Sequence, residues 1–238
     1  MRNMKRTLLL LSLCVVIPIG SAWAGIVGST NPADFTSNTV DWCVVLGCAS
    51  GNSPLAPAQL WTSTAGDQGI VAFFNGGNPF VDSPAGSLYN LQQGTTWGGD
   101  FAAGMGLVYN GVTFGNNPGP LLIAFLQDEY GVGAYIQPDF FGSFSATISL
   151  FDINENLLGS YTTSGVSDGT PGDALFIGAA SGSGAVRFAT FSAFGADPSA
   201  PDFAIGSMQV ETTPEPASLL LLTPALLGLV AFTRRRKG

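Results

Sequence analysis

The sequence contains no histidine among its 238 residues. This absence excludes Ser-His-Asp and Cys-His catalysis, metal sites with histidine ligands, and pH switches that depend on histidine protonation. Charged residues of any kind are also scarce, because they make up 10% of the chain where about 25% is usual.

Basic residues are almost absent from the middle of the chain. Between residues 25 and 213, which we call the body, Arg187 is the one basic residue beside 15 acidic residues, so the body has a formal charge of −14. Nucleic-acid binding is excluded because it needs Lys and Arg on phosphates. The other seven basic residues lie near the two ends, at Arg2, Lys5, Arg6, Arg234, Arg235, Arg236 and Lys237.

Residues 1–24 have the three parts of a secretory signal peptide. The basic start is followed by an apolar run over residues 7–19 and by an Ala22-Trp23-Ala24 cleavage site. The apolar run is short for a membrane span, which argues against an uncleaved anchor. We therefore predict export and cleavage by signal peptidase after Ala24.

The C-terminal segment has the features of a single membrane span. Residues 217–233 carry no charge and are just long enough to cross a bilayer as a helix. The basic residues 234–237 should stay in the cytoplasm, which places the body outside. This pattern predicts a single-pass precursor anchored at its C-terminal end.

Two prolines and one acidic residue complete this pattern, because Pro214-Glu215-Pro216 directly precedes the apolar stretch. The order of tripeptide, apolar helix and basic tail over residues 212–238 resembles the PEP-CTERM sorting signal of Gram-negative bacteria. The resemblance implies recognition by an exosortase, which would cut near the tripeptide and pass the protein to the cell surface or the exopolysaccharide matrix of a biofilm. The alternative is a rigid proline-rich spacer before an ordinary anchor.

Residues 25–211 are predicted to form one antiparallel all-β domain. Glycine-rich turns separate short apolar runs, which is typical of a sandwich or barrel. The clearest strand is 143–151, where apolar residues alternate with Ser and Thr. We expect further strands at 69–74, 106–109, 121–126, 133–136, 157–162, 175–178, 186–192 and 203–210, and a short helical turn at 88–93 as the only helix.

The C-terminal half of this domain also resembles a recurrent ectodomain of PEP-CTERM proteins, through Gly133-Ala134-Tyr135-Ile136-Gln137-Pro138, residues 144–152, Phe176-Ile177-Gly178 and Asp202-Phe203-Ala204-Ile205. Such domains look like lectin-type jelly-roll sandwiches. The resemblance implies a fold and supplies no activity.

Cys43 and Cys48 are the two cysteines left after the signal peptide is removed. An even number of cysteines in an exported chain favours a disulfide. Two reduced, buried thiols are the alternative. A redox role is not expected, because the spacing is not C-x-x-C.

The acidic surplus makes calcium a candidate cofactor, since Ca²⁺ binds carboxylate, amide and carbonyl oxygens. Asp152, Asn154 and Asn156 supply oxygens at alternate positions of one loop, and Asp128-Glu129 is another acidic group. Asp41 and Asp202 would meet if the first and last strands pair. The alternative is a solvated acidic face that keeps the protein soluble.

Trp97 and Asp100 are candidates for glycan contact, because they place an aromatic ring and a carboxylate in one glycine-rich loop. The alternative is a ring that fills the core. The sequence thus predicts an exported surface or matrix protein with no catalytic site of its own. A carbohydrate-binding module with a defined ligand is the first alternative, and a glycan hydrolase with two carboxylates is the second.

Overall fold

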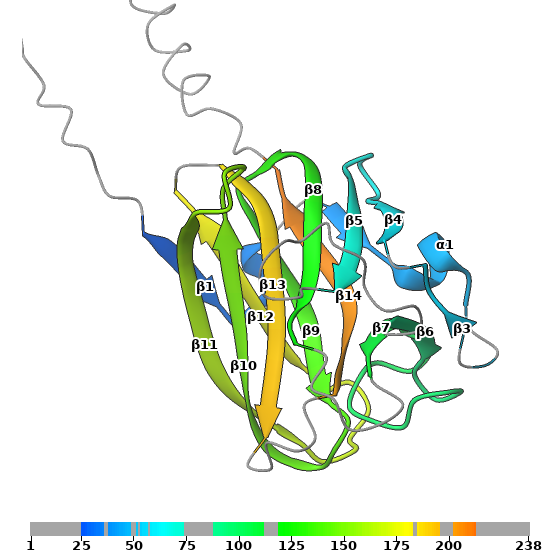
Figure 1. Cartoon of the computed structure of the whole chain (residues 1–238). Helices are drawn as coiled ribbons and strands as arrows, with labels where there is room; N and C mark the ends of the chain where they lie inside the picture. Colours follow the sequence, from blue (N-terminus) through cyan, green and yellow to red (C-terminus); the bar gives the residue numbers. More distant parts are fainter. Residues whose placement is uncertain are drawn as a thin grey trace, which may run out of the picture.

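The computed structural model describes residues 25–35, 38–48, 51, 53–56, 58–73, 88–111, 119–182, 185–195 and 202–212. Nearly all regular structure in these residues is antiparallel β-strand, which confirms the predicted all-β class (Figure 1). None of the helices in these ranges is both long and apolar enough to span a bilayer. The predicted signal peptide and the predicted span lie outside the described residues.

The described strands form two sheets. In the first, β2 (Asn38–Val40) pairs with one edge of β14, and the remaining strands follow the order β1 (Ile26–Ser29), β12 (Leu175–Ser181), β9 (Gly131–Pro138), β14 (Phe203–Glu211), β7 (Gly106–Asn110), β6 (Leu88–Gln92) and β3 (Ser53–Pro54). The second sheet has the order β11 (Leu157–Ser167), β10 (Gly142–Phe151), β13 (Val186–Gly195), β8 (Leu121–Glu129), β5 (Gln68–Phe73) and β4 (Ala58–Thr62).

The two sheets bury their facing sides against each other, and in Figure 1 one layer lies in front of the other. A single core cluster takes side chains from both sheets, including Val132, Ile177 and Ile205 from the first and Leu121, Ile148 and Phe191 from the second. Every strand of both sheets lies between Ile26 and Glu211. The described core therefore draws its residues from within this range.

Strand β10 shows how the sequence specifies this layering. Its buried residues are Phe144, Ala146, Ile148 and Leu150, and the residues between them face away from the core. On that outer side, hydroxyl groups pair across β10 and β11, with Thr147 to Thr162 and Ser149 to Ser160 both at 2.8 Å. Period-two alternation thus gives one apolar and one hydroxyl-bearing face, and the prediction for this strand is confirmed.

The helix predictions were wrong in two places. Residues 88–93, expected to form a helical turn, contain strand β6, which pairs along its length with β7. A short helix occurs instead at α1 (Trp42–Leu46), and a 3-10 turn occurs at η1 (Pro32–Asp34). Asp41 caps the start of helix α1, because its carboxylate accepts a hydrogen bond from the Cys43 N–H at 2.9 Å.

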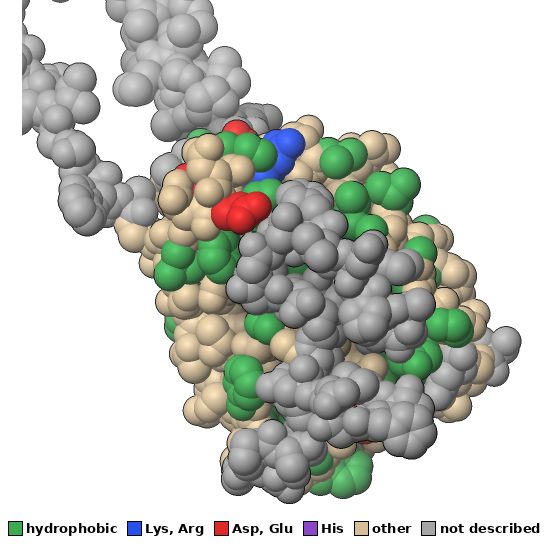
Figure 2. Space-filling view, in the orientation of Figure 1, with side chains coloured by type: hydrophobic (Ala, Val, Ile, Leu, Met, Phe, Trp, Pro, Cys, Tyr) green, Lys and Arg blue, Asp and Glu red, His purple; other side chains and the backbone are tan. Residues whose placement is uncertain are grey.

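The described surface carries few charges. On the face shown in Figure 2, uncharged side chains cover most of the described area, and one basic spot lies close to acidic side chains. Arg187 is the one Lys or Arg in the described ranges, and its Nη1 lies 3.4 Å from Asp128 Oδ1. Because both side chains are partly exposed, this ion pair contributes little to stability.

Candidate functional site

The two ends of the described body lie at the same end of the first sheet. Glu211, where β14 ends, is paired with Gly131 at the start of β9. Gly131 is also paired with Ala180 of β12, next to Ser181, which pairs with Ile26 at the start of β1. We call this the termini end. The opposite end, where β9 finishes at Pro138, is called the pocket end.

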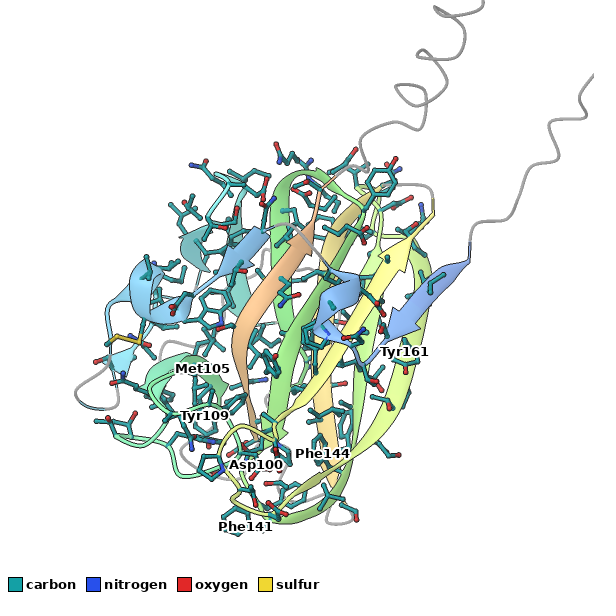
Figure 3. All side chains as sticks on the ribbon, turned by 180° about the vertical axis from the view of Figure 1, so that it is seen from behind. Asp100, Met105, Tyr109, Phe141, Phe144 and Tyr161 are labelled. Atoms are coloured by element: carbon teal, nitrogen blue, oxygen red, sulfur yellow. A yellow bond between two sulfur atoms is a disulfide. The ribbon has the colours of Figure 1, made fainter. Side chains whose placement is uncertain are left out.

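A pocket of about 260 Å³ lies at the pocket end. Its walls are Trp97, Gly98 and residues 137–141, so it combines three aromatic rings with a carboxylate and an amide. Phe141 stands at its rim with 66% of its surface exposed. Figure 3 shows Phe141, Asp100 and Tyr109 together at this end of the molecule.

Gln137 holds the polar side of the pocket in place. Its side-chain oxygen accepts hydrogen bonds from the Asp100 N–H at 2.7 Å and from the Trp97 Nε1–H at 3.4 Å. Its amide nitrogen donates to Ser167 Oγ at 2.8 Å. Gln137 is almost fully buried, so this one side chain fixes the relative positions of the 97–100 loop, β9 and the end of β11.

Asp100 holds the loop that joins β11 to β12. Its carboxylate accepts hydrogen bonds from the backbone N–H groups of Asp168 and Gly169, at 3.2 and 2.5 Å. Its backbone carbonyl accepts two more, from Gly172 at 2.7 Å and Ala174 at 2.9 Å. Gly169 and Gly172 both have positive φ, which suits glycine. Because its side chain is 1% exposed, Asp100 lies in the support of the pocket rather than on its wall.

Tyr109 joins two carboxylates beside the pocket. Its hydroxyl oxygen lies 3.1 Å from Asp139 Oδ2 and 3.2 Å from Asp202 Oδ2. Burial and the two negative charges raise the pKa of the Tyr109 hydroxyl above its ordinary value, so the hydroxyl stays protonated. Partial loss of water also raises the pKa of the Asp139 carboxyl, against the opposing effect of the hydrogen bond from Tyr109.

Of the two residues predicted from the sequence for glycan contact, Trp97 and Asp100, one lines the pocket. Trp97 does line the pocket, although only 8% of its surface is exposed and its ring packs against Phe101 and Tyr109. Asp139 and Phe141 also line the pocket and were not predicted from the sequence as site residues. The signal available was the run Asp139-Phe140-Phe141, since two consecutive aromatics between two predicted strands do not fit the alternation of either strand.

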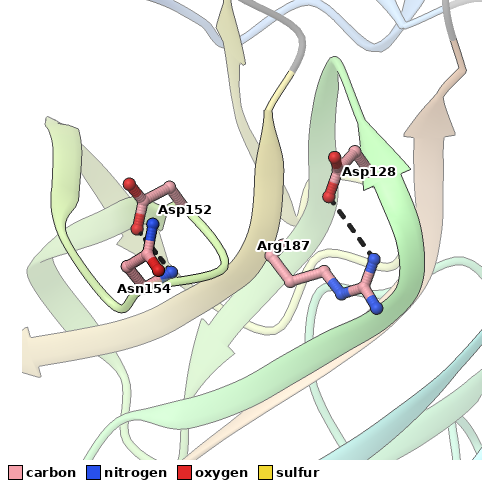
Figure 4. A network of polar contacts seen from close by, with 4 residues as sticks. All are labelled: Asp128, Asp152, Asn154 and Arg187. Carbon is pink, nitrogen blue, oxygen red and sulfur yellow. Dashed lines mark hydrogen bonds and ion pairs between the residues drawn. The ribbon is translucent and has the colours of Figure 1, made fainter.

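The calcium candidates are dispersed in the structure. Asp152 lies in the β10–β11 turn, where its carboxylate accepts a hydrogen bond from the Asn154 N–H at 2.8 Å (Figure 4). It also accepts hydrogen bonds from the Asn156 N–H at 2.8 Å and from Asn156 Nδ2 at 3.0 Å. These bonds, with those from Asn156 first, lower the pKa of the Asp152 carboxyl. In the described ranges no three His, Cys, Asp or Glu side chains are grouped as metal ligands.

Asp41 and Asp202 take separate positions. The first strand, β1, pairs with β12, and the last strand, β14, pairs instead with the second strand, β2, through Val40 and Met208. Asp41 then caps helix α1, whereas Asp202 precedes β14 and lies beside Tyr109. Asp202 is therefore part of the pocket end.

A disulfide joins Cys43 to Cys48 and closes the loop around helix α1. Helix α1 ends at Gly47, which has a positive φ of 81°. The helix thus has a capping carboxylate at its start and a covalent link beyond its end.

A second polar cluster lies near the termini end. Asp67 is buried and accepts hydrogen bonds from Asn38 Nδ2 at 2.7 Å, Ser63 Oγ at 2.8 Å and Gln127 Nε2 at 3.0 Å. Glu129, at the end of β8, is 1% exposed, and its Oε1 has no hydrogen-bond partner among the described residues. In this cluster the Asp67 carboxylate accepts three side-chain hydrogen bonds, whereas Oε1 of Glu129 accepts none from the described residues.

Pro214, Glu215 and Pro216, the basic residues 234–237 and the cleavage residues Ala22 and Ala24 all lie outside the described residues. Their predicted roles stay predictions.

Comparison with known proteins found no matching family model and no matching curated protein. One solved structure with some similarity is the 2.05 Å crystal structure of a DUF4465 family protein from Bacteroides caccae ATCC 43185. It has 11% sequence identity and a TM-score of 0.37, and the match covers 67% of this chain and 87% of that chain. Similarity this distant carries no argument about function.

Proposed function

We propose that this chain is an exported protein of the cell surface or extracellular matrix, sorted by an exosortase and associated with exopolysaccharide. In this proposal, a jelly-roll-like β-sandwich is carried between a signal peptide and a PEP-CTERM sorting signal. The observation that carries it is the order of segments at residues 212–238, namely the tripeptide Pro214-Glu215-Pro216, an uncharged stretch and a basic tail, in a chain that opens with a signal-peptide pattern.

The geometry of the body supports a role in display. Strand β14 ends at Glu211, directly before the sorting segment, and it ends at the termini end. The pocket lies at the other end of β9, and eight residues of strand extend about 26 Å. A precursor held in the membrane by its C-terminal segment would therefore present the pocket away from the membrane surface.

The composition of the body supports a role outside the cell. A formal charge of −14 with one arginine keeps a protein soluble among polysaccharides, water and divalent cations. A disulfide within the body fits an oxidising compartment.

Mass spectrometry of the protein isolated from the cell surface tests the sorting claim. We expect the mature form to lack residues 234–237 and to end close to the tripeptide, and we expect the tail to persist in cells without an exosortase. Replacing Pro214, Glu215 and Pro216 together with alanine should also preserve the tail. Pro201→Ala, a proline outside the motif, is the matched control and should be processed normally. An intact basic tail on the surface form of the unaltered protein would falsify the proposal.

A carbohydrate-binding module is the second candidate function, and the pocket with its aromatic and carboxylate walls favours it. A glycan array probed with the full chain separates this candidate from a purely structural role. Binding confined to a few related glycans supports a module with a defined ligand, whereas no binding supports the structural role.

A further inference from the structure

The pocket at the pocket end is the feature that the proposed sorting does not use. Its volume of about 260 Å³ is just below the range of roughly 300–1,000 Å³ that is usual for pockets of drug-sized ligands. A pocket of this size accommodates one ring-sized unit. A polymer would therefore enter it through a single residue, with the rest of its chain outside.

The apolar walls suit the face of a sugar ring. Phe141 is exposed at the rim, and the position that a side chain on Gly169 would occupy lies 3.3 Å from its ring. The ring thus lies over a glycine of the Asp168–Ala174 loop, which Asp100 fixes through four hydrogen bonds. An exposed aromatic ring beside a fixed loop provides a large apolar contact area for the face of a sugar.

The polar wall offers one free binding group. The Gln137 side chain is 2% exposed; its oxygen accepts from Trp97 and Asp100, and one of its two N–H groups donates to Ser167, so little of it is accessible to a ligand. Asp139 is exposed and accepts one hydrogen bond from Tyr109, so its carboxylate retains lone pairs for a ligand. Asp139 accepts only, which means that the ligand must supply the donor, as hydroxyl and ammonium groups do.

The charge of the site limits the ligand further. None of the described residues that line the pocket is basic, and Asp202 adds a second carboxylate beside Tyr109. Arg187 is paired with Asp128, on strands β13 and β8. An acidic sugar would therefore meet like charge with no counter-charge, whereas an amine would gain a charge-assisted hydrogen bond.

We propose that this pocket binds one residue of a glycan, that the residue is an amino sugar or a neutral sugar, and that uronic acids are excluded. This inference deepens the proposed association with exopolysaccharide and names its ligand class. Phe141 provides the stacking surface, Trp97 forms part of the apolar wall, Asp139 accepts the hydrogen bonds, and Gln137 and Asp100 position these groups.

Titration calorimetry with the full chain in mild detergent tests the proposal, using glucosamine, glucose and glucuronate in the presence of EDTA. At about pH 6 the amine is protonated. We expect glucosamine to bind about tenfold more tightly than glucose, and glucuronate to bind at least about tenfold more weakly than glucose. Glucuronate binding as tight as glucose, or binding that needs added calcium, would overturn the proposal.

Two substitutions separate the contributions. Phe141→Ala should weaken both glucosamine and glucose about tenfold, because it removes the stacking ring. Asp139→Asn should remove the preference for glucosamine over glucose, because it removes the charge and keeps the shape. Leu60→Ala is the matched control: Leu60 is 63% exposed on β4, outside the pocket, and its loss should leave both affinities unchanged. Equal affinities for all three variants and the unaltered chain would place binding elsewhere and overturn the proposal.

This test is independent of the sorting experiment. Binding is measured on purified protein, whereas sorting is measured by the C-terminal mass of the surface form. If the protein binds sugar and keeps its basic tail at the surface, the sorting proposal alone is refuted. If the protein is cut but binds no sugar, the proposal of sugar binding in the pocket alone is refuted.

Discussion

Two buried tryptophans differ in what their indole nitrogens contact. Trp42 is fully buried and its Nε1–H donates to the carbonyl of Gly206 at 2.7 Å, which ties helix α1 to β14. Trp61 is 1% exposed, and its Nε1–H has no partner among the described residues. The two rings are therefore equal in burial and unequal in hydrogen bonding.

Replacing each tryptophan with phenylalanine should separate these effects. Trp42→Phe loses a buried hydrogen bond and leaves the Gly206 carbonyl unpaired, whereas Trp61→Phe removes an unpaired donor. We expect Trp42→Phe to lower the free energy of unfolding by about 1–3 kcal/mol more than Trp61→Phe. Urea unfolding of the two variants measures the difference, and equal losses would show that the bond to Gly206 contributes nothing.

Glu129 makes stability depend on pH. Burial raises the pKa of its carboxyl from 4.5 to about 7; the hydrogen bond from Gln127 opposes this, and the charges of Asp67 and Asp128 add to it. Between pH 4.5 and 7 the folded state therefore keeps a proton that the unfolded state has lost. The unfolded state binds fewer protons in this window, so the contribution of Glu129 to stability falls as the pH rises.

Glu129→Gln should remove this dependence. We expect the variant to unfold with the same free energy as the unaltered protein near pH 4 and to be more stable by about 2 kcal/mol at pH 8. Chemical unfolding at a series of pH values measures the effect as a difference between the two proteins, so that the other carboxyls cancel. Glu155→Gln, in the exposed β10–β11 turn, is the control. A variant that loses stability at every pH would contradict this account of Glu129.

At the scale of strands, β9 and β12 pair through two glycines that make room for aromatic rings. Gly133 lies directly opposite Gly178. A side chain on Gly133 would overlap the ring of Phe176, and one on Gly178 would overlap the ring of Phe35. The two rings are both buried, with centroids 5.6 Å apart. The paired glycines thus allow Phe35, which follows η1, to approach the sheet closely.

Gly178→Ala should therefore destabilise the body by about 1–3 kcal/mol, because the added methyl group must displace Phe35 or the strand. Gly51→Ala provides the control, since nothing lies within 4 Å of the position that its side chain would occupy. Its effect should stay within about 0.5 kcal/mol. Thermal or urea unfolding compares the two variants. Similar losses of stability in both would show that contact with Phe35 does not determine the effect at Gly178.

The limits of sequence prediction also lie at the scale of elements. Strand β10 was predicted because alternation repeats over many residues, and the other long central strands were predicted because turn signals separate their apolar runs. Helix α1 has only five residues, too few to show a helical period, and it depends on the Asp41 cap and on burial of Trp42. Strands β1, β2 and β3 were missed because they have four residues or fewer, which is too short to show the two-residue alternation of a strand.

The pocket was only partly predictable, because it is assembled from distant segments. Trp97, Asp139 and Gly169 lie on three separate loops, and Gln137 and Asp100 connect them. A carboxylate in a glycine-rich loop, such as Asp100, looks the same in a sequence whether it faces a ligand or backbone N–H groups. Only the register of β9 with β14 shows that Asp139 and Asp202 meet beside Tyr109.

At the scale of the whole molecule, the acidic surplus should weaken the folded state at low salt. The described residues contain one ion pair, Arg187 with Asp128, and no other basic side chain to offset the remaining carboxylates. Like charges repel more strongly in the compact state than in the unfolded chain. Their repulsion extends about 30 Å at 0.01 M salt and less than 10 Å at physiological ionic strength.

We therefore expect the melting temperature of the body to rise by several degrees between about 10 mM and about 300 mM NaCl. A variant with Glu155→Gln and Asp173→Asn, two exposed acids, should show a smaller rise. A melting temperature that falls with salt would show that attractive pairs dominate.

Calcium chloride at matched ionic strength then separates screening from binding. Screening alone gives the same melting temperature as NaCl, whereas calcium held at the Asp152 turn or beside Tyr109 gives a higher one that EDTA reverses.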